Sequence, residues 1–211
     1  MKYEYGGVEY EGENFYCYPD SNVLMNKFNI RDGDKLQEIE RKMSYANIVY
    51  LGENPLKGVL DLKYLQKIHK YIFGDIYGWA GRIRGGKFFS KGETVFCVAD
   101  MIPTYADSIF GKLRAERWLR GLERGEFIER LAYFMGEVNA LHPFREGNGR
   151  TQRIFFAELA RRAKYELDYS QVEPDALLEA DIAAYNKDYS FLTALSEKML
   201  TPKDRGDCDD G

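Results

Sequence analysis

Apolar side chains recur at the spacing of an α-helix along most of this chain, and that rhythm restricts its fold more than any other feature. Asp32 or Asp34 can cap the first run, and Asp61 can cap the second, which ends near Gly74. Further helical runs follow at residues 104–122, 126–141, 150–163, 175–185 and 189–200. The pattern predicts an all-α domain, and 211 residues suit one domain with a substantial core.

One segment, residues 85–98, breaks the helical rhythm. Two aromatic residues, a polar turn and a run of β-branched and aromatic residues follow one another there, as FFSKGETVFCV over residues 88–98. This order predicts a β-hairpin inserted into the helical domain. We therefore expect the domain to span residues 31–200, with an irregular strip at 1–30 before it and a mobile tail at 201–211 after it.

Charge and cysteine content argue against several classes of protein. The chain has 30 basic and 34 acidic residues, a net charge of −4, whereas a dedicated nucleic-acid binder normally carries a basic surplus. Cys17, Cys97 and Cys208 show no CxxC spacing, which disfavours a zinc site or a disulfide framework and favours a reducing cytoplasm. There is no apolar run of membrane-spanning length and no apolar stretch typical of a secretory signal. We expect a cytoplasmic protein that binds neither nucleic acid nor membrane.

The run HPFREGNGRTQR, residues 142–153, concentrates groups that bind phosphate. Gly147, Asn148 and Gly149 lie between two predicted helices, where glycine backbones and a helix N-terminus can point N–H groups at an anion. A Gly-x-Gly alone more often forms a plain tight turn. Arg150 and Arg153 favour the phosphate site, because they are three residues apart on a helix and are expected to face the same mouth as the nest. Without an anion between them, two cations would oppose the helix dipole.

The same run offers a base, a metal ligand and an anchor. His142 can take a proton from a hydroxyl near pH 7, although a single histidine at a helix end is more often structural. Glu146 would repel a neighbouring polyphosphate unless a divalent cation bridged them, so it is a candidate Mg²⁺ ligand, with a cap or a surface ion pair as the alternative. Phe144 is expected to turn inward and fix the loop. His69, on the second helix, is expected to be structural.

These residues resemble the signature of the Fic family, HxFx(D/E)GNGRxxR, at every specified position: His142, Phe144, Glu146, Gly147, Asn148, Gly149, Arg150 and Arg153. The segment IHKYIFGDIYGWAGRIR, residues 68–84, looks like the family's helix and Trp-Ala-Gly-x-x-Arg segment. Residues 16–30 are similar to the N-terminal strip of stand-alone bacterial Fic proteins. The resemblance covers residues 15–200 and implies the Fic fold, a helical domain with an inserted hairpin.

The family's usual activity is transfer of AMP from ATP to a Ser, Thr or Tyr hydroxyl of a target protein, with release of pyrophosphate. The resemblance implies that His142 deprotonates the hydroxyl and that Glu146 holds the Mg²⁺ on the α- and β-phosphates. It likewise implies that the anion nest is Gly147, Asn148 and Gly149, and that the β- and γ-phosphates meet Arg150 and Arg153. The hairpin is similar to the family's flap, which pairs with an extended target segment. Its residues here are Ser90, Lys91, Gly92, Glu93, Thr94, Val95 and Phe96.

Control and substrate are further expectations from the resemblance. Many Fic proteins carry an inhibitory helix, (S/T)xxxE(G/N), whose glutamate pairs with the second motif arginine, and neither end of this chain contains the whole pattern. The chain thus resembles a toxin whose small helical antitoxin supplies that glutamate in trans, with DNA gyrase or another topoisomerase as a candidate target. Transfer of another phosphate-containing group, as from CDP-choline, a kinase reaction and a non-catalytic binding module are alternatives. The intact motif favours a triphosphate with Mg²⁺.

Overall fold

The computed structural model describes residues 2–5, 8–11, 16–86, 88–91 and 94–202 of the chain. Its α-helices are α1 (Gly33–Glu53), α2 (Leu62–Phe73), α3 (Ile102–Ala115), α4 (Arg124–Leu141), α5 (Asn148–Arg162), α6 (Pro174–Tyr185) and α7 (Ser190–Met199). Its strands are β1 (Lys2–Tyr5), β2 (Val8–Glu11), β3 (Phe88–Lys91), β4 (Thr94–Val95), β5 (Tyr165–Leu167) and β6 (Leu200–Pro202). The mostly helical architecture confirms the predicted fold class.

Helix starts follow the capping signals of the sequence. The Asp32 carboxylate accepts a hydrogen bond from the Lys35 N–H at 3.0 Å, and Asp61 accepts one from the Tyr64 N–H at 2.8 Å. The predicted helix at 104–122 is wrong in its second half, because α3 ends at Ala115 and residues 117–119 take positive φ angles. A tertiary bond accompanies this break, since the Trp118 indole N–H donates to the Leu60 carbonyl at 3.2 Å.

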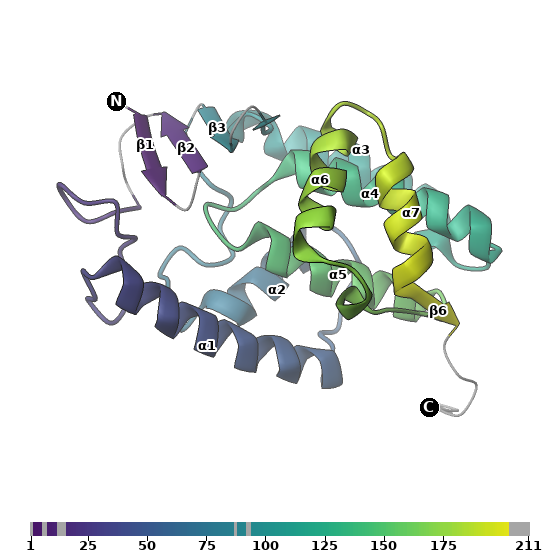
Figure 1. Ribbon diagram of the computed structural model, residues 1–211, viewed down its shortest axis with the longest axis horizontal. Helices are drawn as coiled ribbons and strands as arrows, with labels where there is room; N and C mark the ends of the chain where they lie inside the picture. The colour runs from purple at the N-terminus through teal and green to yellow at the C-terminus, as the bar shows by residue number, and fades with distance from the viewer. Residues whose placement is uncertain (1, 6–7, 12–15, 87, 92–93, 203–211) are drawn as a thin grey trace.

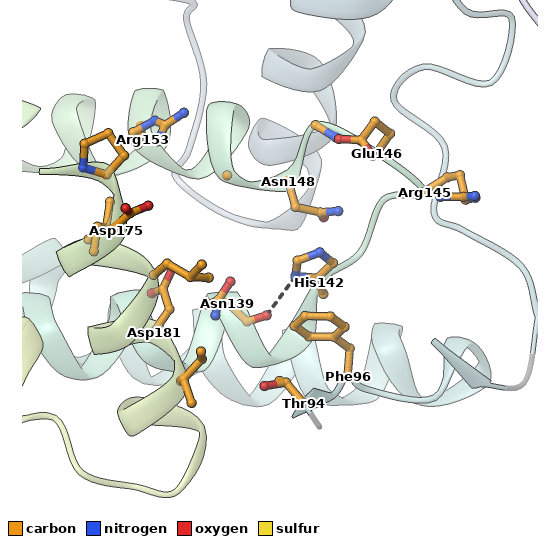
Figure 2. A pocket seen from close by; sticks show the side chains of 16 residues that line it. Thr94, Phe96, Asn139, His142, Arg145, Glu146, Asn148, Arg153, Asp175 and Asp181 are labelled. Carbon is orange, nitrogen blue, oxygen red and sulfur yellow. Dashed lines mark hydrogen bonds between the residues drawn. The ribbon is translucent and has the colours of Figure 1, made fainter. Parts of the chain in front are cut away.

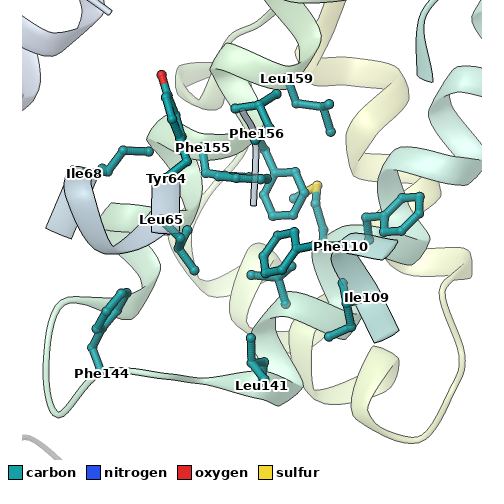
Figure 3. Close-up of a cluster of buried hydrophobic side chains, with 14 of the residues drawn as sticks. Tyr64, Leu65, Ile68, Ile109, Phe110, Leu141, Phe144, Phe155, Phe156 and Leu159 are labelled. Atoms are coloured by element: carbon teal, nitrogen blue, oxygen red, sulfur yellow. The ribbon is translucent and has the colours of Figure 1, made fainter. Parts of the chain in front are cut away.

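The core is built around α5, whose apolar residues meet several neighbouring helices. Phe155 packs edge-on against Tyr64 of α2 and Phe110 of α3, with ring centroids 6.2 Å and 5.7 Å apart (Figure 3). Phe156 and Leu159, one and four residues further along α5, are also buried. Burial of one such side chain contributes about 1.5–3 kcal/mol. The packing of the middle of α5 therefore fixes the position of its N-terminal turn. This turn carries part of the motif.

The helices on either side of α5 set the surroundings of that turn. Figure 1 shows α1 beside α2 and α5, with α6 and α7 on the opposite side of the molecule. The α4 helix packs against α5, α6 and α7, and α1 packs against α2 and α5. The motif loop joins α4 to α5 and so lies among these packed helices.

A four-stranded antiparallel sheet, in the order β1-β2-β3-β4, lies at one end of the molecule (Figure 1). Glu9 pairs with Ser90, which in turn pairs with Val95, so β1 and β2 extend the predicted hairpin. The prediction that residues 1–30 are irregular is therefore wrong for β1 and β2. The signal was available, because tyrosine or valine alternates with glutamate in both segments, which is the period of a strand.

The C-terminal part of the chain contains a second small sheet that the sequence did not indicate. β5 and β6 are antiparallel, and Leu167 pairs with Leu200. Thr201 and Pro202 thus belong to a strand instead of the expected mobile tail, and residues 203–211 lie outside the described part of the chain. Among the helices that the structure describes, none is long and apolar enough to cross a membrane.

Replacing glycine by alanine should have opposite effects on the free energy of unfolding at two helical positions. A Cβ at Gly136 of α4 would meet the Tyr189 ring at 2.7 Å and the Ala184 methyl at 2.9 Å, whereas a Cβ at Gly111 of α3 would meet nothing within 4 Å. Gly136→Ala should lower the free energy of unfolding by about 1–3 kcal/mol through overpacking. Gly111→Ala should raise it by about 0.5–1 kcal/mol through helix propensity. Urea unfolding measures both changes in the free energy of unfolding. Changes of the same sign in the two variants would contradict this packing.

Candidate active site

The motif forms the connection between α4 and α5. The α4 helix ends at His142, which takes the left-handed conformation with φ 43°, and Gly147 caps α5 with φ 80°. The side chain of Asn148 closes the loop between them: its Oδ1 accepts from the Phe144 N–H at 2.9 Å, and its Nδ2 donates to the Phe144 carbonyl at 2.7 Å. The side-chain amide of Asn148 therefore bonds within the protein and closes the loop.

A buried histidine on α2 holds the same loop from behind. The Gly81 N–H donates to Nδ1 of His69 at 2.8 Å, so the proton lies on Nε2, which donates to the Glu146 carbonyl at 2.8 Å. Burial lowers the pKa of His69 to about 4, so the ring is neutral at physiological pH. Phe144 is fully buried and stacks on the His69 ring with centroids 4.0 Å apart. These contacts are those expected of a Phe144 that anchors the loop and of a His69 with a structural role.

A cavity of about 670 Å³ opens above the loop. Figure 2 shows His142 and Phe96 on one side of it and Arg153 with Asp175 across from them, with Asn148 between the two groups. The cavity is lined by Thr94, Phe96, Asn139, His142, Arg145, Glu146, Gly147, Asn148, Gly149, Arg153, Pro174, Asp175, Leu177, Leu178, Asp181 and Ile182. One hollow thus collects the candidate base, the glycines and one of the two candidate arginines.

The floor of the cavity is the first turn of α5, whose leading N–H groups have no acceptor within the helix. The Glu146 carboxylate accepts a hydrogen bond from the Gly147 N–H at 2.9 Å. Glycine at 147 is demanded by the fold, because φ is +80° and a Cβ would overlap the Phe73 ring. At Gly149 a Cβ would meet no protein atom within 4 Å, although this residue lines the cavity. Protein packing gives no reason for glycine there, whereas close approach of a ligand does.

The two motif arginines point in different directions. Arg150 forms an ion pair with Glu40 at 2.6 Å and a longer one with Glu146 at 3.6 Å, donates to the Ser44 hydroxyl at 3.1 Å and does not line the cavity. Arg153 lines the cavity, and within the described part of the chain no residue forms an ion pair with it. The prediction that both arginines face the mouth of the nest is wrong for Arg150. Residues three apart on a helix point in directions that differ by about 60°. This difference directs Arg150 toward the Glu40 carboxylate on α1 and leaves Arg153 on the cavity side.

Glu40 was missed as a site residue, and its position on α1 carried a signal. Leu36, Glu40, Ser44 and Leu51 are the buried residues of this helix, so two polar side chains lie on its inward face. The Tyr77 hydroxyl donates to the second oxygen of Glu40, in addition to the Arg150 pair on the first. A polar residue on an apolar stripe indicates a buried partner. Here that partner is the first arginine of the motif.

Acidic and phenolic groups surround the Arg153 end of the cavity. Burial raises the pKa of Asp181 to about 7, against the attraction of the Arg153 guanidinium. Burial also raises the pKa of Tyr169, whose hydroxyl has no hydrogen-bond partner among the described residues. A carboxyl group that titrates near neutrality beside a cation gives this end of the cavity a charge that depends on pH.

The donor set suits a magnesium ion that arrives with a phosphorylated ligand. The Glu146 carboxylate adjoins the glycines through its bond from the Gly147 N–H, and the described residues contain no group of three or more potential metal ligands. Mg²⁺ is commonly held by one or two carboxylates together with phosphate oxygens and water. A single carboxylate beside an anion nest fits that arrangement.

The hairpin contributes a wall and an open edge. Thr94 and Phe96 line the cavity, Ser90 is buried, and Val95 is 39% exposed. β4 is the last strand of the sheet, so its outer edge has no partner strand among the described segments. Gly92 and Glu93 of the expected flap lie outside the described residues, as does the side chain of Lys91.

Comparison with known proteins gives the family. Residues 59–160 match the Fic/DOC family. The chain is 41% identical over 194 residues to protein adenylyltransferase VbhT of Bartonella schoenbuchensis, covering 92% of this chain and 40% of that protein. It is 39% identical to the probable protein adenylyltransferase y4lH of Sinorhizobium fredii, covering 89% of this chain and 96% of that protein.

Solved structures agree with the sequence relatives. BepC of Bartonella tribocorum with bound AMPPNP superimposes with a TM-score of 0.84 at 27% identity, covering 89% of this chain and 97% of that one. A Fic domain of Bartonella quintana with bound ADP has the same TM-score at 30% identity, covering 90% and 95%. The chain belongs to the Fic/DOC family. The fold and the enzyme class expected from the motif, a protein adenylyltransferase that uses a nucleotide, are confirmed by these relatives.

Gly149→Ala should separate ligand binding from folding. The Cβ has room in the protein, so the free energy of unfolding should stay the same or rise by up to about 1 kcal/mol. The methyl group would narrow the nest, so affinity for ATP, measured by calorimetry, should fall at least about tenfold, which corresponds to about 1.4 kcal/mol. Unchanged ATP affinity would contradict the nest at this position.

Nucleotide affinity should depend on the charge of Asp181. Because its pKa is raised to about 7, Asp181 is neutral below that pH and adds a negative charge near Arg153 above it. ATP affinity should therefore fall several-fold between pH 6 and pH 8, and Asp181→Asn should remove the part of this fall that exceeds the titration of ATP itself. If ATP affinity depended on pH in the same way in the parent and in Asp181→Asn, Asp181 would not be the titrating group.

Proposed function

We propose that the cavity binds ATP along its length and that the chain transfers AMP to a Ser, Thr or Tyr hydroxyl of a target protein. The observation that carries the proposal is the placement of His142 and Arg153 on opposite sides of one cavity whose floor is a helix N-terminus. Free N–H groups and a guanidinium suit a polyphosphate. Leu178 and Ile182 of α6, which are 45% and 48% exposed, offer an apolar wall for the base.

The chemistry follows from the position of His142. Its Nδ1 lies 3.2 Å from the Asn139 carbonyl, which favours the tautomer with the proton on Nδ1 and the basic lone pair on Nε2. Nε2 takes the proton of the target hydroxyl, the oxygen forms a bond to the α-phosphorus, and the bond to the β-phosphate oxygen breaks, so pyrophosphate leaves. Glu146 would hold the Mg²⁺ that neutralises charge on the phosphates.

The flap would present the target. The open edge of β4 can pair with an extended segment of the target protein, as strand addition does elsewhere, and Thr94 and Phe96 on its inner face adjoin the cavity. Main-chain pairing tolerates many side-chain sequences. The target is thus proposed only by class, with DNA gyrase or another topoisomerase in the cytoplasm as the first candidate.

Control by an antitoxin is the second part of the proposal. Arg153 lacks an ion pair among the described residues, so a glutamate from a small helical partner bearing (S/T)xxxE(G/N) can compete there with the γ-phosphate. Thr193 and Glu197 of α7 have the Ser/Thr–Glu spacing of that pattern. However, Lys198 follows, Glu197 is exposed, and neither residue lines the cavity. A helix supplied in trans therefore fits better than α7.

The donor molecule decides between this function and its alternatives. The chain should be incubated in bacterial lysate with ATP, GTP or CDP-choline, each carrying a label in the transferred group, and labelled proteins identified by mass spectrometry. A mass increase of one AMP from ATP supports the proposal. Phosphocholine labelling would favour the alternative transfer, and no labelling with any donor would favour a binding module.

Replacing His142 should stop transfer while leaving nucleotide binding intact. Loss of a general base costs about 10²–10⁴ in rate, and the imidazole is proposed to act on the target hydroxyl. His142→Ala should therefore lower labelling by that factor, with an ATP dissociation constant within about threefold of the parent, a change of less than 1 kcal/mol. Labelling within a few-fold of the parent would remove His142 from the mechanism.

A further inference from the structure

Arg84, the last residue of the Trp-Ala-Gly-x-x-Arg segment, is a buried cation with an unusual set of partners. It is 2% exposed. Its Nε donates to the His142 carbonyl at 2.8 Å, its Nη2 donates to the Cys97 carbonyl, and its backbone N–H donates to the Pro143 carbonyl at 2.8 Å. A charged group held inside the protein this way must be satisfied by its hydrogen bonds.

The acceptors of Arg84 come from two segments far apart in the sequence. Cys97 follows the flap, and its own N–H donates to the Ala140 carbonyl of α4 at 3.0 Å. His142 lies at the end of α4. One planar guanidinium therefore ties the end of the flap to the backbone of the proposed base. Its rigid fork can hold two carbonyls in a fixed relation, which a single ammonium group cannot do.

The same connection fixes a contact between the flap and the imidazole. The ring of Phe96, next to Cys97, stacks on the His142 ring with centroids 3.7 Å apart. The Arg84 guanidinium also lies over the Phe89 ring at 4.6 Å, and the Phe96 N–H donates to the Phe89 carbonyl at 2.9 Å. The flap strands, the arginine and the imidazole thus form one packed unit.

The backbone at His142 needs such external support. A residue with a side chain at φ 43° is in the left-handed region, which costs energy unless the surroundings hold it. Arg84 bonds the carbonyls of His142 and Pro143, and the Asn148 side chain bonds the backbone of the next residue, Phe144. These bonds hold the backbone from which the imidazole projects.

We propose that Arg84 is a positioning residue for AMP transfer, which fixes the distance between the flap that presents the target hydroxyl and the imidazole of His142. It acts through these two elements and does not line the cavity itself. The inference rests on the proposed roles of His142 and the flap. Its test needs a readout that does not depend on catalysis.

The histidine content of the chain provides that readout. His69 and His142 are the two histidines of the sequence, so proton NMR gives one Hε1 and one Hδ2 signal from each of two imidazole rings. Phe96 stacked on His142 shifts the ring protons of His142 upfield, whereas His69 reports the motif loop through its Glu146 bond. The variants are Arg84→Ala, Arg84→Lys and, as a control in the same segment, Arg82→Ala, whose side chain is exposed.

Both Arg84 variants should move the His142 signals downfield and leave those of His69 in place. Labelling of protein from ATP should fall by about 10²-fold, the usual effect of misplacing a reacting group by about 1 Å, while the ATP dissociation constant changes less than threefold. The Arg82→Ala control should match the parent in all three measurements. Because Arg84→Lys keeps the charge and the aliphatic stem, it decides the question if Arg84→Ala fails to fold.

Two results would overturn the inference. Unmoved His142 signals in Arg84→Lys would show that the guanidinium does not position the imidazole. Shifts of both histidines together with loss of ATP affinity would show a general structural role. If the parent chain itself labels no protein, the proposed function fails, and the NMR comparison still shows whether Arg84 holds the flap against His142.

Discussion

The hydrogen bond from the neutral imidazole of His69 to the Glu146 carbonyl is the interaction on which the site depends. It fixes the backbone between two ends that are each in an unusual conformation, the left-handed His142 and the αL cap at Gly147. The ring can donate there because the Gly81 N–H occupies its other nitrogen and burial keeps it uncharged. A site for a highly charged ligand is thus supported from behind by an uncharged, fully bonded group, which adds no charge of its own near the phosphates.

The two motif arginines have different surroundings. Arg150 forms a largely buried pair with Glu40 and lies over the Phe73 ring at 4.6 Å, so it joins α1, α2 and α5. Removing one partner of a buried pair commonly costs about 3–5 kcal/mol because the other charge is left unpaired. Arg153 remains on the cavity side with Asp181 and Tyr169 around it. At this end of the cavity the charge therefore depends on Arg153 and on the protonation of Asp181.

The sequence predicted the parts of the site that act locally. Aspartate caps located the starts of two helices, the helical rhythm gave the fold class, and the motif spacing gave the loop between α4 and α5. These features depend on residues within a few positions of one another. The direction of Arg150 could not be predicted this way, because its partner Glu40 is 110 residues away and is brought near only by the packing of α1. The role of Arg84 likewise depends on carbonyls of two distant segments.

Strands β1, β2, β5 and β6 were missed for a different reason. β1 and β2 are short and become stable only by pairing with β3, so their alternating pattern competes with the appearance of an irregular terminus. The strand pair β5 and β6 has three residues in each strand, which is too short for a periodic signal. Tertiary pairing, and not local preference, produced these elements. The fold class was unaffected because the core consists of helices.

In the proposed complex, ATP lies with its α-phosphorus beside His142 and its terminal phosphates toward Arg153. The direct measurement uses two samples of ATP, labelled with ³²P at the α- or the γ-phosphate, incubated with the chain in bacterial lysate. If ATP lies this way, α-labelled ATP should label protein, whereas γ-labelled ATP should give labelled pyrophosphate and no labelled protein. Protein labelling from the γ-phosphate that is lost in Arg153→Ala would contradict this orientation, because the nucleotide would then lie in the cavity in the opposite direction.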